Sequence, residues 1–371
     1  MKIIQCNSVL IRGDAISNII LTNNQLLEDA GFNPEIVLDF FSEYPYNSKI
    51  HELADVDFKE ISPLKHKIEY FFKAKKTYLL KYYLRAAMRY KHNVSKKLLK
   101  AADLRIWHMG LAYPLLKLVR QNDFIYFHNF GFPYLTDYPS VEITSSRQLQ
   151  DLKYIKLNFI TPSNFNKETL MRLGFPEQSI TVLPLFHKVN LPFKVHDPPS
   201  KPTLLTYGRY ANNKAVPEIA KMAKEADLGL IAFGDNYTTH EYKKQYTECK
   251  KYESNNIKIY GKLPSIDGVF NDANIYISNS YHEGFNMPLI EAEAHSLPVL
   301  ARRGTAMDEL VKDGYNGFLF DDISEVPDLA DKIMRNYATM SYNAWKHSQG
   351  YTLDKYKERY LRILEEYRNF R

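Results

Sequence analysis

The sequence contains very little cysteine. Only Cys6 and Cys249 occur in 371 residues, so the chain has neither a disulfide framework nor the cysteine spacing of a zinc site. A chain that does without disulfides fits a reducing compartment. We therefore expect a cytoplasmic protein.

Long hydrophobic runs are also missing. No apolar stretch approaches the roughly 20 residues that a membrane span needs. Polar residues interrupt the N-terminal sequence too soon for a signal peptide, and there is no internal repeat. Hydrophobic residues still make up 45% of the chain, which is enough for real cores, and the length predicts about two domains.

Positive charge is concentrated in one segment. Residues 64–100 hold twelve Lys and Arg against one acid, Glu69, which gives +11, whereas the whole chain carries +6 and the remainder therefore −5. Tyrosine and phenylalanine alternate with these lysines, and such a composition is typical of an interface with anionic lipid. A solvated pair of helices is the alternative, and nucleic-acid binding also fits the charge. We expect one or two helices here and attachment to the cytoplasmic face of a membrane.

Strands and helices are predicted to alternate in both halves of the chain. This alternation is typical of an α/β fold with parallel sheets. Strands are predicted at 1–10, 34–40, 104–108, 124–128, 156–160, 180–183, 204–207, 228–233, 257–260, 275–278, 299–301 and 317–320. Helices are predicted at 15–30, 111–120, 145–154, 164–173 and 353–368.

A proline-rich stretch separates the two halves. Residues 191–202 contain four prolines and no hydrophobic period, which indicates a linker. We therefore predict an N-terminal domain over 1–190, a C-terminal domain over 203–350 and a last helix over 351–371.

The most informative stretch is Ser278–Ala301. Pro288 suits a first helical position, Pro298 is expected to stop the helix, and a short strand follows. Glu283 and Glu291 then flank a helix N-terminus, where anions are favoured. Carboxylates accept hydrogen bonds, so this arrangement suits a ligand with hydroxyls and phosphate, such as a sugar nucleotide. The alternative is an amphipathic helix with two solvated glutamates.

This stretch resembles a family signature. In the retaining GT-B glycosyltransferases of group 1 (family four), two glutamates separated by seven residues frame a Gly-Phe-Gly-Leu-Pro-like turn, and here the motif is E-GFNMPLI-E. The resemblance implies that Glu283 binds the donor sugar and Glu291 the nucleotide ribose. It also implies that the turn formed by Gly284, Phe285, Asn286 and Met287 faces the sugar and diphosphate. Asn286 replaces the usual second glycine, and asparagine tolerates positive φ better than most residues.

A second motif opens the C-terminal half. Thr203–Lys214 contains Gly208-Arg209 after a predicted strand and Lys214 five residues later, and it resembles the G-R-x-x-x-x-K signature of the same family. A departing nucleoside diphosphate gains negative charge, which fixed cations stabilise. Arg209 and Lys214 are the candidates for this role. The alternative is a surface pair that happens to follow a strand.

The resemblance extends to weaker positions. Gly13-Asp14 lies in a turn similar to one at the donor site of some relatives, although an ordinary tight turn would read the same. Lys262 and Leu263 follow a strand where relatives bind the base, mainly through backbone. His128 matches the family's N-domain histidine, with a locally satisfied histidine as the alternative. His108 is a weaker candidate of the same kind, and Glu309 belongs to a closing motif that we interpret as structural.

Together these features predict a GT-B enzyme with two Rossmann-like domains whose parallel sheets face each other across a cleft. The resemblance implies retaining transfer of a hexose from a nucleotide-diphosphate sugar to a hydroxyl of a glycan or lipid-linked glycan acceptor. It implies no protein nucleophile, no cofactor and no metal. A metal-dependent GT-A enzyme is the alternative to which Asp55 and Asp57 point, but these residues do not follow a predicted strand. An epimerase of the same fold and a non-catalytic subunit of a transferase complex stay open as further alternatives.

Overall fold

The structure is a computed structural model that describes residues 1–10, 15–42, 50–52, 98–108, 119–128, 155–194, 201–237, 239–263, 266 and 268–369. The predicted Gly13-Asp14 turn, most of the basic segment 64–100 and the predicted helices 111–120 and 145–154 lie largely or wholly outside these residues. Among the described residues, no helix is long and apolar enough to cross a membrane.

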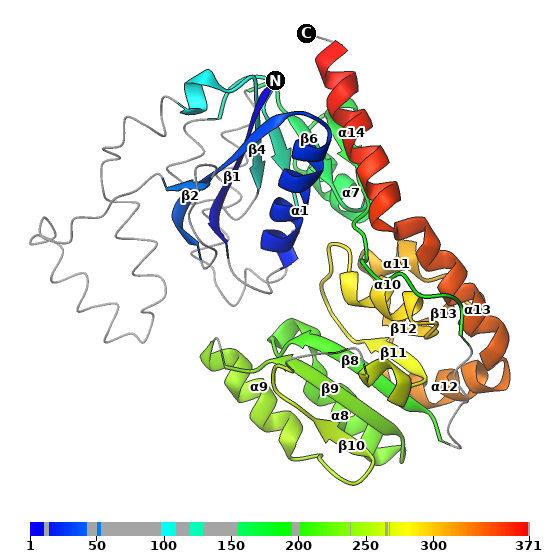
Figure 1. Ribbon diagram of the computed structural model, residues 1–371. Helices are drawn as coiled ribbons and strands as arrows, with labels where there is room; N and C mark the ends of the chain where they lie inside the picture. Colours follow the sequence, from blue (N-terminus) through cyan, green and yellow to red (C-terminus); the bar gives the residue numbers. More distant parts are fainter. Residues whose placement is uncertain are drawn as a thin grey trace, which may run out of the picture. The chain divides into compact units, whose positions relative to one another are not determined.

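The chain divides into two compact units, each built on its own sheet (Figure 1). Unit 1 comprises residues 1–128, 139–161 and 170–181, and unit 2 comprises 129–138, 162–169 and 182–371. The domain boundaries, the linker and the path of the last helix inferred from the sequence stay predictions.

Unit 1 contains a sheet of seven strands in the order β3-β2-β1-β4-β5-β6-β7. The pairings from β3 through β6 are parallel, as the alternation of strands and helices predicts. Ile3, Ile4 and Ile106 lie fully buried in its central strands. The elements are β1 (Lys2–Leu10), α1 (Ala15–Asp29), β2 (Asn33–Ser42), β3 (Ile50–Glu52), β4 (Leu104–His108), β5 (Phe124–Tyr126), β6 (Asn158–Thr161) and β7 (Ile180–Val182). The helix α7 (Asn164–Arg172) begins in unit 2 and ends in unit 1.

Unit 2 contains a parallel sheet of six strands in the order β10-β9-β8-β11-β12-β13. Its core joins apolar side chains of these strands to those of α8, α12 and α13. The elements are β8 (Thr203–Arg209), η5 (Asn212–Lys214), α8 (Val216–Glu225), β9 (Gly229–Asp235), α9 (His240–Lys250), β10 (Ile257–Ile259), β11 (Ile275–Ser278), α10 (Met287–Ala294), β12 (Val299–Arg302), α11 (Met307–Leu310), β13 (Gly317–Phe320), α12 (Val326–Arg335), α13 (Tyr337–Ser348) and α14 (Leu353–Asn369).

The element predictions that fall within the described residues are confirmed to within a few residues, with two differences in position. The helix after Glu283 ends at Ala294, before Pro298, because Ser296 adopts a left-handed conformation (φ 66°) that ends the helical backbone. The strand expected over 124–128 ends at Tyr126, so His128 follows the strand and does not lie in it. The short strand β3 was not predicted.

Candidate active site

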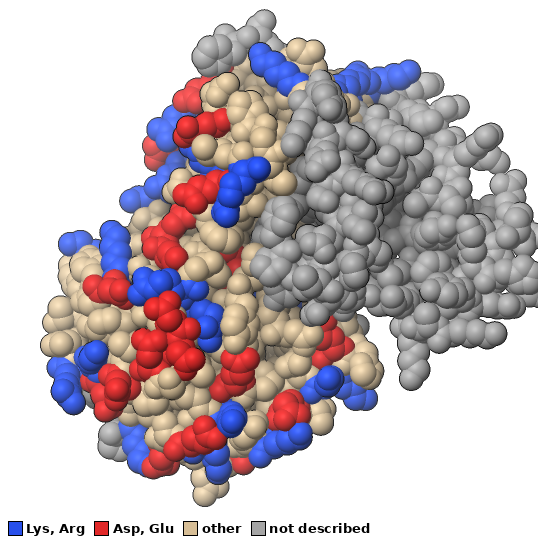
Figure 2. All heavy atoms as spheres, turned by 180° about the vertical axis from the view of Figure 1, so that it is seen from behind, with Lys and Arg blue, Asp and Glu red and all other residues tan. Residues whose placement is uncertain are grey.

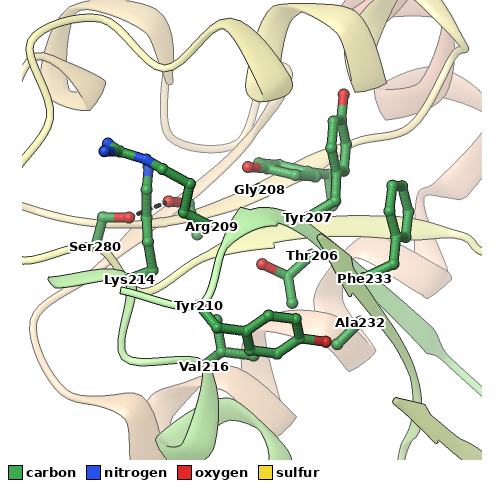
Figure 3. A pocket seen from close by; sticks show the side chains of 12 residues that line it. Thr206, Tyr207, Gly208, Arg209, Tyr210, Lys214, Val216, Ala232, Phe233 and Ser280 are labelled. Atoms are coloured by element: carbon green, nitrogen blue, oxygen red, sulfur yellow. Dashed lines mark hydrogen bonds between the residues drawn. The ribbon is translucent and has the colours of Figure 1, made fainter. Parts of the chain in front are cut away.

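The phosphate-binding candidates of unit 2 lie at the carboxyl end of β8. Arg209 ends this strand, and the 3-10 turn η5 brings Lys214 back toward it. Both side chains line one pocket (Figure 3). We call it the donor pocket, and its lining consists of Thr206, Tyr207, Gly208, Arg209, Tyr210, Lys214, Val216, Ala232, Phe233, Tyr276, Ser278 and Ser280. Open α/β sheets bind ligands at this edge.

A pair of glycines shapes the backbone at this edge. Gly208 and Gly234 are partners in the β8–β9 register, and both have positive φ, at 138° and 153°. A Cβ on Gly234 would lie 1.4 Å from the Gly208 carbonyl oxygen. Glycine is therefore required at position 234, and it lets the two strands approach closely under the donor pocket.

Lys214 forms an ion pair with Glu283. Glu283 lies in the loop between β11 and α10 and is 6% exposed. The backbone holds this loop, because Ala306 N donates to the Glu283 carbonyl oxygen at 3.2 Å. Arg209 is exposed and donates to the Tyr242 hydroxyl of α9 at 3.4 Å. The structure thus brings the first glutamate of the E-x7-E motif together with the lysine of the second motif.

Glu291 is the second glutamate of the motif and lies inside α10. Its carboxylate accepts a hydrogen bond of 2.7 Å from the Tyr207 hydroxyl. Burial raises the pKa of Glu291, and the Tyr207 hydrogen bond opposes this shift. The Tyr207 ring stacks on Phe233 at 5.0 Å, which fixes the direction of its hydroxyl.

The turn between the two glutamates is held by Asn286. This residue has φ 76° and ψ 72° and caps α10, whose first turn contains Pro288, as predicted. Its amide side chain is buried, so it faces the protein interior. Gly284 and Phe285 are buried and Met287 is half-buried. Lys262 and Leu263 follow β10, the first exposed and the second half-buried.

The two histidines of unit 1 form a buried pair. His108 Nδ1 lies 2.7 Å from His128 Nε2, and His108 Nε2 lies 3.1 Å from Gln5 Oε1. Gln5 Nε2 donates to the Ile20 carbonyl at 3.1 Å, so its Oε1 must accept the proton of His108 Nε2. His128 Nε2 then donates to His108 Nδ1, and His128 Nδ1 carries no proton.

Burial keeps this histidine pair neutral. It lowers the pKa of His128 to about 3 and also lowers that of His108, with the neighbouring His128 as a second cause. His128 belongs to unit 1 and the donor pocket to unit 2, so its role at the donor sugar stays a prediction.

Several residues of the donor pocket were missed by sequence reasoning. Tyr207 directly precedes the Gly-Arg motif, and Ser280 precedes Glu283 by three residues. Tyr276, Ser278 and Phe233 also line the pocket. Their proximity in sequence to recognised motifs was the available signal, but an alternating strand pattern does not say which face of a strand end meets a ligand. Within the described residues, no three His, Cys, Asp or Glu side chains gather as a metal site.

Comparison with known proteins assigns this geometry to a family. Residues 188–340 match the family model described as "Glycosyl transferases group 1". This part of the chain is similar to the group 1 glycosyltransferases. It contains the donor pocket and both motifs.

Individual relatives agree with this assignment. A probable sucrose-phosphate synthase of Thermosipho melanesiensis is 27% identical over 130 residues, which are 34% of this chain and 31% of that protein. The matched parts span about a third of the length of such curated relatives.

Solved structures extend the likeness over the whole chain. The sucrose-phosphate synthase from Thermosynechococcus elongatus has a TM-score of 0.74 at 16% identity and covers 100% of this chain and 98% of its own. Anabaena HepE in complex with UDP has a TM-score of 0.70 at 14% identity and covers 99% of this chain and 100% of its own. Likeness at this identity shows the fold, and that fold is GT-B, as the sequence resemblance predicted.

Proposed function

We propose that this protein is a retaining hexosyltransferase that transfers a sugar from a nucleotide-diphosphate donor to a hydroxyl of a glycan or lipid-linked glycan, without a metal. One observation carries the proposal. Arg209 and Lys214 line a single pocket, and Lys214 is paired with Glu283 of the E-x7-E motif. Cations beside a carboxylate suit a ligand that carries phosphate at one end and hydroxyls at the other.

The nucleotide end of the donor is proposed to bind between β8 and α10. Glu291 would accept hydrogen bonds from the ribose hydroxyls, and Tyr207 would hold its carboxylate in place. Anabaena HepE, which shares the fold, was solved in complex with UDP, and this supports a nucleotide as the ligand. The base would contact the backbone near Lys262 and Leu263.

The chemistry needs charge stabilisation at the leaving group. As the bond to the sugar breaks, the nucleoside diphosphate gains negative charge, and Arg209 and Lys214 are aimed to stabilise it. Arginine binds phosphate oxygens with two parallel hydrogen bonds, whereas lysine acts as a point charge. In the front-face mechanism the leaving phosphate takes the proton of the acceptor hydroxyl on the same side. We therefore assign no nucleophile, and Glu283 would hold the sugar hydroxyls.

A donor panel tests the proposal. UDP-, GDP- and dTDP-sugars are first scored for binding by calorimetry and then for turnover with glycan acceptors, with and without excess chelator. We expect one nucleotide class to bind and its sugar to be transferred with retained anomeric configuration. If no donor binds, the proposal is wrong. Conversion of a donor without an acceptor would indicate an epimerase.

A further inference from the structure

A chain of hydrogen bonds links the start of α10 to the donor pocket. The Asn286 carboxamide oxygen accepts from Leu289 N at 3.2 Å and from the Tyr276 hydroxyl at 3.3 Å. Its Nδ2 donates to Ser278 Oγ at 3.0 Å. Ser278 Oγ in turn lies 3.1 Å from Ser280 Oγ. All of these side chains are buried, with Ser280 only 1% exposed.

The direction of these hydrogen bonds follows from the bond between Leu289 N and Asn286. A backbone N–H only donates, so the atom of Asn286 that faces Leu289 N is the oxygen, and Nδ2 is the atom that faces Ser278. Ser278 accepts this proton and directs its own proton to Ser280. Ser280 accepts at its oxygen, and its single O–H proton is then directed away from Ser278.

Ser280 lies where an anion is expected. Its side chain lines the donor pocket beside Lys214 and Arg209, and the dashed line in Figure 3 marks its bond to Ser278. Phosphate oxygens accept hydrogen bonds and do not donate them. A hydroxyl that lines a pocket with two cations and has its proton directed away from Ser278 is therefore complementary to a phosphate.

We infer that Ser280 is a donor-binding residue that gives a hydrogen bond to a phosphate oxygen of the nucleotide, and that Asn286 is the positioning residue that sets the direction of this bond. The inference rests on the proposed function, because it assumes that the pocket binds a nucleoside diphosphate. It also explains the departure of Asn286 from the usual glycine. A glycine would fit the left-handed backbone, but it would remove the side-chain amide that bonds to both Ser278 and Tyr276.

Removal of the Ser280 hydroxyl is the first test. Calorimetry measures the affinity of the wild type and Ser280→Ala for whichever of UDP, GDP or dTDP the wild type binds, and for the matching monophosphate. We expect about a tenfold loss for the diphosphate, since a hydrogen bond to a charged acceptor is among the stronger ones. The monophosphate should lose as much if the bond is to the phosphate that both ligands carry, and less if it is to the second phosphate. Ser341→Ala is the matched control. Ser341 lies in α13, and its buried hydroxyl donates to the Ser296 carbonyl oxygen at 2.6 Å. Its removal should leave both affinities unchanged.

Reversal of the chain is the second test. In Asn286→Asp, both side-chain oxygens accept, so Ser278 must donate to Asp at this position and Ser280 must then donate to Ser278. This change should weaken diphosphate binding about as much as Ser280→Ala does. Added negative charge could produce a similar loss, and the double variant separates the two causes. If the reversed hydrogen bonds are the cause, Asn286→Asp lowers the diphosphate affinity only slightly in the Ser280→Ala background.

The outcomes distinguish this inference from the function on which it rests. If the wild type binds no nucleoside diphosphate, the proposed function is wrong and this inference with it. If the wild type binds one and Ser280→Ala binds it equally well, the inference alone is overturned. Full loss from Asn286→Asp in the Ser280→Ala background would also overturn it. Melting temperatures of all variants show whether each is folded.

Discussion

Lys214 and Glu283 form an ion pair at the edge of the donor pocket. The exposed fractions of their side chains are 18% and 8%, so removal of one partner leaves the other charge poorly solvated. A bound diphosphate would give Lys214 a second anionic partner. The pair therefore holds the lysine near its proposed working position before the donor arrives.

Substitution of the two cations should affect turnover more than folding. We expect Arg209→Ala and Lys214→Ala each to lower kcat by about 10²–10³, as the loss of one transition-state contact does. Steady-state kinetics measure this, and Lys221→Ala is the control because its side chain is 58% exposed on α8. Near wild-type turnover in the double variant would reject the assignment.

Glu291 should make nucleotide binding dependent on pH. Burial raises its pKa above the ordinary value of 4.5, and only the ionised form offers full acceptor capacity to a ribose. Affinity should therefore fall as pH falls through this raised pKa, and Glu291→Gln should remove the dependence with about a tenfold loss at neutral pH. Tyr207→Phe should move the fall to higher pH, because the tyrosine hydrogen bond lowers the pKa. Calorimetry measures the affinity for the bare nucleotide from pH 5 to 8. The prediction would be contradicted if the affinities of wild type and Glu291→Gln showed the same dependence on pH.

At the scale of elements, α10 is tied to α13 by a buried carboxylate. Glu293 is fully buried and accepts from Asn316 Nδ2 at 2.6 Å, while its other oxygen lies 2.8 Å from His347 Nδ1. Glu293 follows Glu291 by two residues in the same helix. The two glutamates have different partners in the structure. Glu291 contacts Tyr207 of the donor pocket, whereas Glu293 contacts the neighbouring helix α13.

This contact should make stability dependent on pH. Burial raises the pKa of Glu293, so the folded state holds the proton more tightly than the unfolded state does. Its contribution is fully present below the unfolded pKa of about 4.5 and is lost as pH rises through the raised folded pKa. The free energy of unfolding of the wild type should thus decline relative to Glu293→Gln over this window. Denaturant titrations at several pH values test this. They are repeated in a His347→Gln background, which removes the imidazole beside Glu293. The prediction would be contradicted if the free energy of unfolding of the wild type and of Glu293→Gln changed equally with pH.

The close approach of β8 and β9 predicts a sharp difference between two glycines. Gly234→Ala should lower the free energy of unfolding by on the order of 1–3 kcal/mol, since its Cβ would collide with the Gly208 carbonyl in a positive-φ conformation. Gly268→Ala should be tolerated, because its Cβ would meet nothing within 4 Å. Thermal melts of both variants compare them. Equal melting temperatures would mean that the strands can separate without cost.

For the whole molecule, charge is distributed unevenly along the chain. The described surface in Figure 2 shows lysines and arginines beside aspartates and glutamates, and ion pairs such as Lys250–Glu253 and Arg303–Asp313 neutralise them locally. Residues 64–100 carry a net charge of +11, and the acidic residue Glu69 alone offsets their lysines and arginines within that segment. Nearly all of this segment lies outside the described residues, so its membrane role stays a prediction.

Vesicle sedimentation tests that prediction. We expect the protein to sediment with vesicles that contain anionic lipid, and less so as salt rises, since each surface lysine contributes about 1 kcal/mol and is screened. Replacement of six lysines within 64–100 by serine should abolish binding, whereas neutral vesicles serve as the control. A protein that stays in solution with anionic vesicles at low salt would indicate a merely charged surface and a soluble acceptor.

Local patterns in the sequence were sufficient for the elements. The strands 104–108, 275–278 and 317–320 were predicted with the bounds that the structure has, because short apolar runs bounded by turn residues have few alternatives. Pro288 likewise indicated the start of α10, which the structure has at Met287. The end of α10 was wrong because Ser296 ends it through a left-handed conformation, which serine rarely adopts and no pattern announces.

The sequence by itself determined the parallel α/β architecture and the glycosyltransferase motifs, since both are written in spacing along the chain. Only the tertiary structure decided which side chains work together. It paired Lys214 with Glu283, gave Glu291 its Tyr207 partner and connected Asn286 to Ser280. These contacts join segments up to 84 residues apart. They depend on strand order and helix packing. The sequence could not show them because burial and hydrogen bonding depend on distance in space, and the distance between two residues along the chain does not determine it.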